Sequence, residues 1–350
     1  MTAIPVRNVY YLLSYAWGLL EEADTLAVET EDLPQVSDLL ARLLVSGTNR
    51  LLRKGVDCGY LSQTEILSTI RGRVDFGTSS RRLLLLQGKA QCDYEEFLPD
   101  LLHNKILKAS LQSLVGLPQL AESQRKGVHS VLRRMEGISP LKLTKAHFSR
   151  VRLHRNNAHY RLLMHVCELL YDNLLVNEQT GQITFRDLLR DDRQMAKLFE
   201  AFVANFYAKE SDWDVTAQER ISWDCPVPSP LLPEMRADAV LRNANRVLVV
   251  ECKFYQQTLQ DGRWNDRPKL HSAHLYQLTS YLENLKPGLS EQTLEGMLLY
   301  PVVGVDLLED LVIAGKRVRA CTLNLERTWR EIADQMLGFL AVTSSPALDH

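Results

Sequence analysis

The stretch "EMRADAVLRNANRVLVVECKFY", residues 234–255, contains two hydrophobic runs that charged residues interrupt. "RADAVLR" and "RVLVVECKF" each read as a strand, and the turn-forming segment "NANR" between them predicts a hairpin. Glu251 and Lys253 are two residues apart, so their side chains project from one face of the second strand. Asp238 on the neighbouring strand can reach that face. Because buried charges are unfavourable unless they are paired or bind a metal, these three residues predict a functional site.

Two carboxylates on one face can hold a hard cation such as Mg²⁺ through oxygen ligands, and Mn²⁺ accepts similar ligands. A bound cation would favour the ionised form of the carboxylates. The lysine beside them can orient an attacking water or stabilise charge that develops on a phosphate. The structural alternative is a half-buried ion pair between Asp238 and Lys253, with Glu251 capping a strand end. The buried run "VLVVE" favours the site, because an unpaired acid and base in a central strand would be costly.

Two predicted helices carry further candidates. In "MAKLFEAFVANFY" (195–207), Glu200 lies beside an apolar stripe, where it is either a surface charge or a third acidic group near the metal. In "HLYQLTSYLENL" (274–285), Gln277 and Tyr281 share one helix face and can contact substrate phosphates or brace the lysine. The alternative for the second helix is an ordinary amphipathic helix with a leucine core stripe.

The predicted fold class is α/β, or α+β over the whole chain. The polar segment around residues 177–185 marks a boundary between domains 1–180 and 181–350. The second domain has a mixed sheet with flanking helices, and the first is mainly helical with a β-hairpin-rich insertion at 58–92. The helices are expected at 8–22, 33–55, 100–115, 119–135, 144–150, 157–175, 192–209, 269–285 and 326–341. The strands of the sheet are expected at 213–221, 235–242, 246–254, 295–302 and 317–324.

Composition limits the classes of function. The 350 residues suffice for two domains, and a net charge of −2 excludes a strongly basic nucleic-acid coat. Six scattered cysteines without a CxxC pair argue against a zinc site or a disulfide framework, and favour small buried side chains in a reducing compartment. The N-terminus lacks the pattern of a signal peptide, and no apolar run reaches the roughly 20 residues of a membrane span. We therefore expect a cytoplasmic protein that contacts no membrane.

The order of helix with Glu200, Asp238, hydrophobic run, ExK and QxxxY resembles the PD-(D/E)xK nuclease superfamily, particularly its RecB-like branch. The opening "IPVRNVYYLLSYAWG" (4–18) is similar to the McrC family, the nuclease subunits of McrBC methylation-dependent restriction systems. The similarity runs from Ile4 to about residue 340 and includes four further segments. These are "TEILSTIRGRVDF" (64–76), "NKILK" (104–108), "LLPEMRADAVL" (231–241) and "HLYQL" (274–278).

The resemblance implies a division of labour. The N-terminal domain would dock on a ring of McrB, an AAA+ motor that hydrolyses GTP and reads methylated cytosine, and would stimulate that GTPase. The C-terminal domain would cut double-stranded DNA, with Asp238 and Glu251 as metal ligands and Lys253 as the catalytic lysine. Ala237 stands where the superfamily name has proline, and Glu251 where some McrC proteins have aspartate. No GxxxxGK[ST] loop is present, so we expect this chain to bind no nucleotide itself.

Arg71 and Arg73 flank Gly72 in the predicted insertion. If the insertion is a finger that enters the partner's ring, an arginine there could steer groups around the bound nucleotide. The alternative is a solvated, charged hairpin tip.

Three functions remain in competition. The first is a Mg²⁺-dependent endonuclease subunit that works with a GTPase. The second is a non-catalytic activator of an NTPase ring, against which the intact Asp238, Glu251 and Lys253 argue. The third is a RecB-like repair nuclease without a restriction partner, which leaves "IPVRNVYYLLSYAWG" unexplained. We therefore expect the first.

Overall fold

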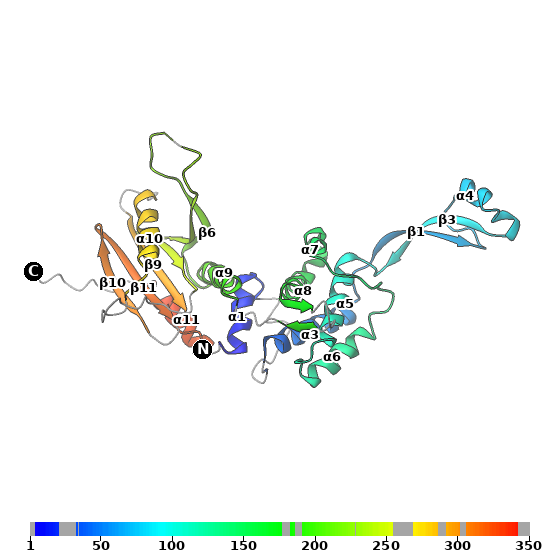
Figure 1. Cartoon of the computed structure of the whole chain (residues 1–350), viewed down its shortest axis with the longest axis horizontal. Helices are drawn as coiled ribbons and strands as arrows, with labels where there is room; N and C mark the ends of the chain where they lie inside the picture. Colours follow the sequence, from blue (N-terminus) through cyan, green and yellow to red (C-terminus); the bar gives the residue numbers. More distant parts are fainter. Residues whose placement is uncertain are drawn as a thin grey trace, which may run out of the picture. The chain divides into compact units, whose positions relative to one another are not determined.

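The chain divides into two compact units, drawn in Figure 1. The computed structural model describes residues 4–20, 33, 35–176, 183–185, 191–227, 229–254, 269–285, 292–301 and 306–341. Of these, residues 4–20, 33, 35, 36 and the described part of 191–341 form one unit, here called the sheet unit. Residues 37–176 and 183–185 form the other, here called the helical unit.

The sheet unit is built on a mixed sheet of six strands in the order β10-β11-β9-β8-β7-β6. β9 runs parallel to both β8 and β11, and the other neighbours are antiparallel. The predicted mixed sheet with flanking helices is thus confirmed. The strands are β6 (Asp214–Ile221), β7 (Met235–Arg242), β8 (Arg246–Cys252), β9 (Thr293–Pro301), β10 (Leu308–Ile313) and β11 (Lys316–Leu323). The helices are α1 (Val6–Ala16), α9 (Asp192–Glu210), α10 (Ser272–Asn284) and α11 (Trp329–Gly338).

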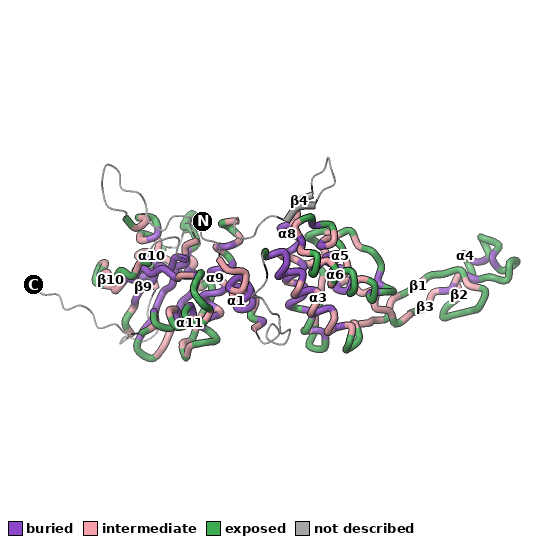
Figure 2. Tube along the Cα trace, turned by 90° about the horizontal axis from the view of Figure 1, so that it is seen from below, coloured by how far each residue is buried: buried purple, intermediate pink, exposed green. Residues whose placement is uncertain are grey.

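The β7–β8 hairpin forms as predicted. Asn243 closes its turn, because its backbone N–H donates to the carbonyl of Arg246 (3.0 Å) and its Oδ1 accepts from the N–H of Arg246 (2.8 Å). Every residue of β8 is buried, and the centre of the sheet is the buried part of this unit in Figure 2. A strand buried on both faces is near-continuously hydrophobic, which is the pattern of "RVLVVEC".

Helix α10 lies close against the sheet because one strand residue has no side chain. A Cβ on Gly296 of β9 would lie 2.9 Å from side-chain carbons of both Leu278 and Leu282. A larger residue would force these two leucine side chains to move. Since α10 also carries Gln277 and Tyr281, this contact positions the candidate site.

Helix α1 belongs to the sheet unit, whereas the sequence grouped it with residues 1–180. Tyr11 stacks on Trp329 of α11 with ring centroids 4.5 Å apart. The side-chain amide of Asn8 donates to the carbonyl of Leu325 (2.7 Å), and that of Asn205 on α9 donates to the carbonyl of Tyr15 (3.0 Å). The apolar periodicity predicted a helix here but did not reveal which surface covers it.

The helical unit contains a bundle and an inserted arm. The bundle helices are α3 (Val36–Lys54), α5 (Leu102–Val115), α6 (Glu122–Leu132), α7 (Lys145–Arg150), η2 (Arg155–Tyr160) and α8 (Arg161–Asn173), and β4 (Leu174–Val176) pairs with β5 (Ile183–Phe185). The arm, residues 59–98, is a three-stranded antiparallel sheet in the order β1-β3-β2. Its elements are β1 (Gly59–Leu67), β2 (Arg73–Val74), α4 (Phe76–Arg81), η1 (Leu85–Gln87) and β3 (Ala90–Leu98). The hairpin-rich insertion expected at 58–92 is therefore present and extends a few residues further.

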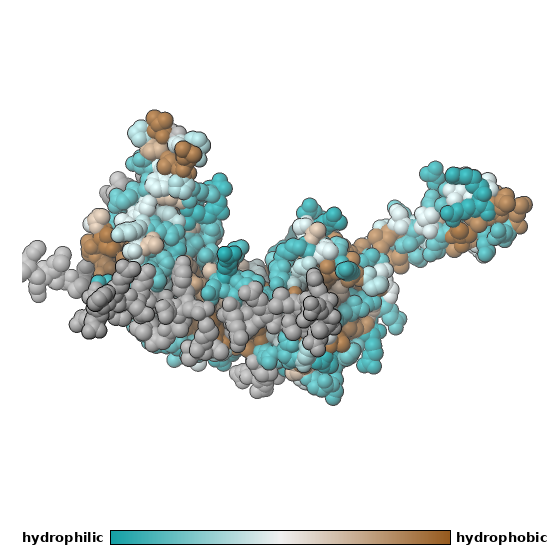
Figure 3. All heavy atoms as spheres, viewed as in Figure 1, coloured by the Kyte–Doolittle hydropathy of each residue, from teal (hydrophilic) through white to brown (hydrophobic). Residues whose placement is uncertain are grey.

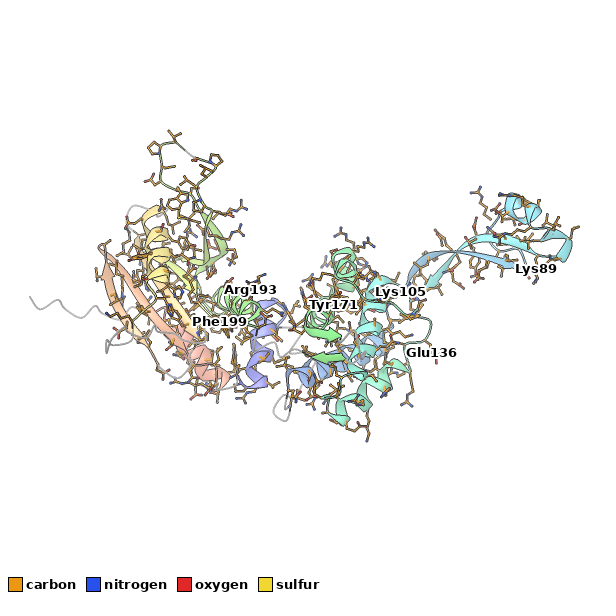
Figure 4. All side chains as sticks on the ribbon, viewed as in Figure 1. Lys89, Lys105, Glu136, Tyr171, Arg193 and Phe199 are labelled. Carbon is orange, nitrogen blue, oxygen red and sulfur yellow. The ribbon has the colours of Figure 1, made fainter. Side chains whose placement is uncertain are left out.

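One buried side chain holds the root of the arm. The amide nitrogen of Asn104, in the "NKILK" segment, donates to the carbonyls of both Asp57 and Pro99, each at 2.8 Å. These residues stand just before β1 and just after β3. The hydroxyl of Tyr160 donates to Asn104 Oδ1 (2.7 Å) and accepts from the N–H of Asp57 (3.0 Å). Figure 4 labels Lys105 beside this root, and Lys89 towards the far end of the arm.

The cysteines and the length of the apolar helices were also predicted from the sequence. All six cysteines are free; four are buried, while Cys58 and Cys225 are partly exposed. The expectation that all six are buried was wrong for these two, which lie outside the unit cores. Among the described helices, none is both long and apolar enough to cross a bilayer.

Candidate active site

Asp238 and Glu251 face each other at one end of the sheet. They stand one step beyond the Ala239–Val250 pair of the β7–β8 ladder. Both are buried, with Glu251 only 2% exposed. Asp238 Oδ2 accepts a hydrogen bond from the backbone N–H of Cys252 (2.8 Å), which fixes one of its oxygens.

Lys253 follows directly on β8 and its backbone N–H still donates to Leu299 of β9 (2.9 Å). Its ammonium donates to Glu251 Oε1 (2.7 Å) and to Gln277 Oε1 (2.9 Å). The structural alternative required an ion pair between Lys253 and Asp238. The carboxylate that Lys253 contacts is instead Glu251, while the two oxygens of Asp238 accept from the N–H of Cys252 and from Gln218.

Gln277 and Tyr281 brace the lysine from α10. Gln277 accepts from the lysine and donates through Nε2 to the Tyr281 hydroxyl (2.7 Å). Tyr281 is buried in the core of the sheet unit together with Leu278 and Leu282. The helix is therefore amphipathic, as the alternative held, and also carries the two polar groups to the lysine.

Glu200 and Asp238 share one hydrogen-bond donor, Gln218, which was not among the residues predicted from the sequence. The Gln218 amide on β6 donates to Asp238 Oδ1 (3.3 Å) and to Glu200 Oε2 (3.4 Å). Gln218 has a φ of 52°, an unusual conformation for a residue with a side chain. Strain of this kind persists where the surrounding structure enforces it, often at functional sites. The pattern of "DVTAQERI" contains no signal for it, because alternation does not predict a left-handed residue.

Burial dominates the electrostatics of these acids. It raises the pKa of Glu251 above its ordinary value, and the neighbouring Asp238 carboxylate raises it further. Burial also raises the pKa of Asp238, although the Cys252 N–H and Lys253 oppose this shift. For Glu200, burial and then Asp238 raise the pKa to about 7. Three acids with raised pKa values in one place favour binding of a cation.

The donor set fits a hard divalent cation. Glu251 Oε2 is buried and has no hydrogen-bond partner, which is unfavourable unless another group takes that oxygen. Within the described part of the chain, no group of three or more His, Cys, Asp or Glu side chains is arranged to hold a metal alone. Mg²⁺ is commonly held by one or two carboxylates with waters and substrate phosphates as its other ligands. Asp238 and Glu251 would suffice for that arrangement.

These raised pKa values predict a pH-dependent stability effect for Glu200→Gln. A carboxyl whose pKa is raised from 4.5 to about 7 on folding destabilises the folded state once pH exceeds the unfolded value. This loss of stability increases with pH up to about the pKa of Glu200 in the folded state. We therefore expect Glu200→Gln to raise the melting temperature of the metal-free protein by a few degrees at pH 8, and by progressively less towards pH 4. Thermal melts across this pH range measure it; an equal shift at every pH would contradict the assignment.

Arg71 and Arg73 lie on the arm and are not part of this cluster. The Arg71 guanidinium stacks 4.1 Å from the Tyr94 ring centroid and donates to Glu96 (3.1 Å). Arg73 is exposed on β2. Gly72 between them has a φ of 64°, and a Cβ there would lie 2.4 Å from the Asp93 carbonyl oxygen, so the turn requires glycine. The intramolecular contacts of Arg71 accord with the alternative of a charged hairpin, and a role in partner binding stays a prediction.

Comparisons with known proteins identify the family of the chain and support its fold. A relative in Escherichia coli (strain K12), named "Type IV methyl-directed restriction enzyme EcoKMcrBC", is 32% identical over 338 residues, covering 95% of this chain and 96% of the relative. One solved structure is the "Refined half-complex from tetradecameric assembly of Thermococcus gammatolerans McrB AAA+ hexamers with bound McrC". It matches 97% of this chain and 77% of its own chain, with a TM-score of 0.60 and 17% identity, which shows the shared fold. The family described as "McrBC 5-methylcytosine restriction system component" matches residues 6–301. The chain therefore belongs to the family of McrBC 5-methylcytosine restriction system components.

Proposed function

We propose that this protein is the DNA-cleaving subunit of a modification-dependent restriction complex, a Mg²⁺-dependent endodeoxyribonuclease. The observation that carries the proposal is the buried cluster of Asp238, Glu251 and Lys253, in which one Glu251 oxygen has no hydrogen-bond partner. Family membership supports the same conclusion independently of the geometry.

Each residue of the cluster has a chemical role in phosphodiester hydrolysis. Asp238 and Glu251 would hold Mg²⁺, which when bound supplies Lewis-acid stabilisation of phosphate charge. Lys253, with its ammonium fixed by Gln277, would orient the attacking water or stabilise the charge that develops on the phosphate. Tyr281 would fix Gln277. Gln218, which donates to both Asp238 and Glu200, would keep the Asp238 carboxylate in place.

We further propose that the partner is an McrB-like AAA+ GTPase ring, which this chain stimulates, and that the substrate is double-stranded DNA with 5-methylcytosine. The name of the Escherichia coli relative and the McrB hexamers in the similar structure support this proposal. The helical unit would contact the ring through the arm.

The surface of the arm supports a role in binding. Its far end carries the exposed apolar residues Leu83, Leu85 and Leu86, and Figure 3 shows hydrophobic surface gathered there. Apolar groups that cluster on an exposed element often mark a protein interface. Such a contact would deliver a nuclease of nearly neutral charge to DNA through another subunit.

Plasmid cleavage in Mg²⁺ tests the proposal. The protein would be assayed with and without its AAA+ partner and GTP, on methylated and unmethylated DNA. Cleavage that requires partner, GTP and methylation would establish the restriction subunit. Cleavage by this chain alone, indifferent to GTP and methylation, would identify a RecB-like repair nuclease. Stimulation of GTP hydrolysis without any cleavage would identify a non-catalytic activator.

A further inference from the structure

The loop between β6 and β7, residues 222–234, ends in an exposed apolar tip. Of its described residues, Leu231 is 91% and Val227 is 80% exposed. Figure 3 shows the hydrophobic cap that this loop forms on the sheet unit. Exposing large apolar side chains is unfavourable in water, so a tip of this kind is typical of a contact surface.

The base of the loop is braced. The indole N–H of Trp223 donates to the carbonyl of Pro233 (2.7 Å), which ties the outgoing strand to the returning one. The backbone N–H of Asp224 donates to Asn284 Oδ1 at the end of α10 (2.8 Å). Higher in the loop, the N–H of Leu232 donates to the carbonyl of Ser229 (3.1 Å). These bonds hold the apolar tip away from the core of the unit.

The loop projects from the same end of the sheet as the catalytic cluster. It leads into Met235, and Asp238 follows about 10 Å further along β7. Because β8 is antiparallel to β7, Glu251 at its end lies at that edge too. DNA bound at the carboxylates would therefore lie near the base of the loop.

Two arginines lie between the loop and the cluster. Arg236 is two residues before Asp238, so it shares its strand face, and Arg220 pairs with Arg236 across the β6–β7 ladder. Both guanidinium groups contact Glu234, and the side chain of Arg220 is largely exposed. Guanidinium groups at this position can bind phosphates of a duplex that extends from the loop towards the carboxylates.

We propose that this loop is a DNA wedge: Val227 and Leu231 insert between base steps of the duplex, while Arg220 and Arg236 bind the adjacent phosphates. The inference rests on the proposed nuclease function and specifies how that site holds its substrate. Apolar side chains of this kind unstack and kink DNA in other proteins, and the bend lets more of the backbone contact the protein. The wedge would present a kinked phosphodiester to Asp238.

The test compares Val227→Ser/Leu231→Ser with Val312→Ser in the full chain with its AAA+ partner and GTP. Val312 is a matched control, since it is 66% exposed on β10 at the opposite edge of the sheet. We expect the loop variant to cleave intact methylated plasmid about tenfold or more slowly, with unchanged stimulation of GTP hydrolysis. An abasic site near the cut should restore much of the cleavage rate of the loop variant, because base stacking is already lost at that position.

The possible results distinguish a DNA wedge from a contact with the partner ring or with a second copy of the chain. Wild-type cleavage by the loop variant, an equal defect in Val312→Ser, or no rescue by the abasic site would each overturn the wedge. A parallel loss of GTPase stimulation would assign the tip to the partner ring, and a change in oligomeric state would assign it to a second copy of the chain. If the wild-type complex cuts no DNA at all, the nuclease proposal itself fails, which is a different result.

Discussion

Lys253→Ala is expected to reduce DNA cleavage by the complete complex about 100- to 1,000-fold while GTPase stimulation stays within about twofold of wild type. The lysine ammonium donates to Glu251 at 2.7 Å, and Lys253 belongs to the sheet unit. In the proposed reaction, its removal would take away the positive charge that stabilises the developing charge on the phosphate. It also leaves Glu251 with less compensation, so the pKa of that carboxyl rises further and cation binding weakens.

Plasmid cleavage and GTP hydrolysis measured on one preparation check this result. Lys316→Ala is the matched control, because Lys316 forms an exposed ion pair with Glu283 in the same unit. Thermal melts establish that the Lys253 variant folds. If a folded Lys253→Ala complex cut DNA at the wild-type rate, the catalytic role would be wrong; if it also lost GTPase stimulation, the assignment of the two activities to separate units would fail.

Deletion of the arm should have the opposite effect. Replacing residues 59–98 by a short Gly-Ser linker is expected to reduce GTPase stimulation to the basal rate of the partner. The same protein should keep the thermal transition of the sheet unit, because the arm makes up no part of that unit. The linker need not be long, since the carbonyls of Asp57 and Pro99 bind the same Asn104 nitrogen.

GTP hydrolysis by the ring, measured against increasing concentrations of the deletion protein, checks this expectation. Leu83→Ser/Leu85→Ser/Leu86→Ser is the milder companion, which keeps the arm and removes its exposed apolar end. The tip variant should need a higher concentration for half-maximal stimulation. Full stimulation by the deletion protein at wild-type concentrations would rule out the arm as the activating element.

The sequence predicted most of the sheet unit because its signals are local. The "NANR" turn, the buried run of β8 and the two-residue spacing of Glu251 and Lys253 each depend on neighbours in the chain. The strand β10 was missed because it is an edge strand in which no residue is buried. Its turn passes through Ala314 and Gly315, both with positive φ, a conformation that alanine rarely adopts and that the sequence does not signal.

What the sequence did not predict depends on contacts between distant residues. The placement of α1 follows from the stacking of Tyr11 on Trp329, 318 positions later in the chain. The role of Gln218 follows from one backbone conformation and from its distance to Asp238 and Glu200. No periodicity in either segment encodes these contacts, so only the folded chain reveals them.

The root of the arm has a consequence for how such proteins diversify. Because Asn104 binds both the departing and the returning chain, and Tyr160 and Asn157 also bind Asp57, the bundle fixes the arm at its root. We therefore expect the bundle to accept an arm of different length or tip at this root. Chimaeras that exchange residues 59–98 between relatives should therefore fold, and each should acquire the partner preference of the donor. The arm would thus be an exchangeable module, and Asn104 would hold it on the bundle.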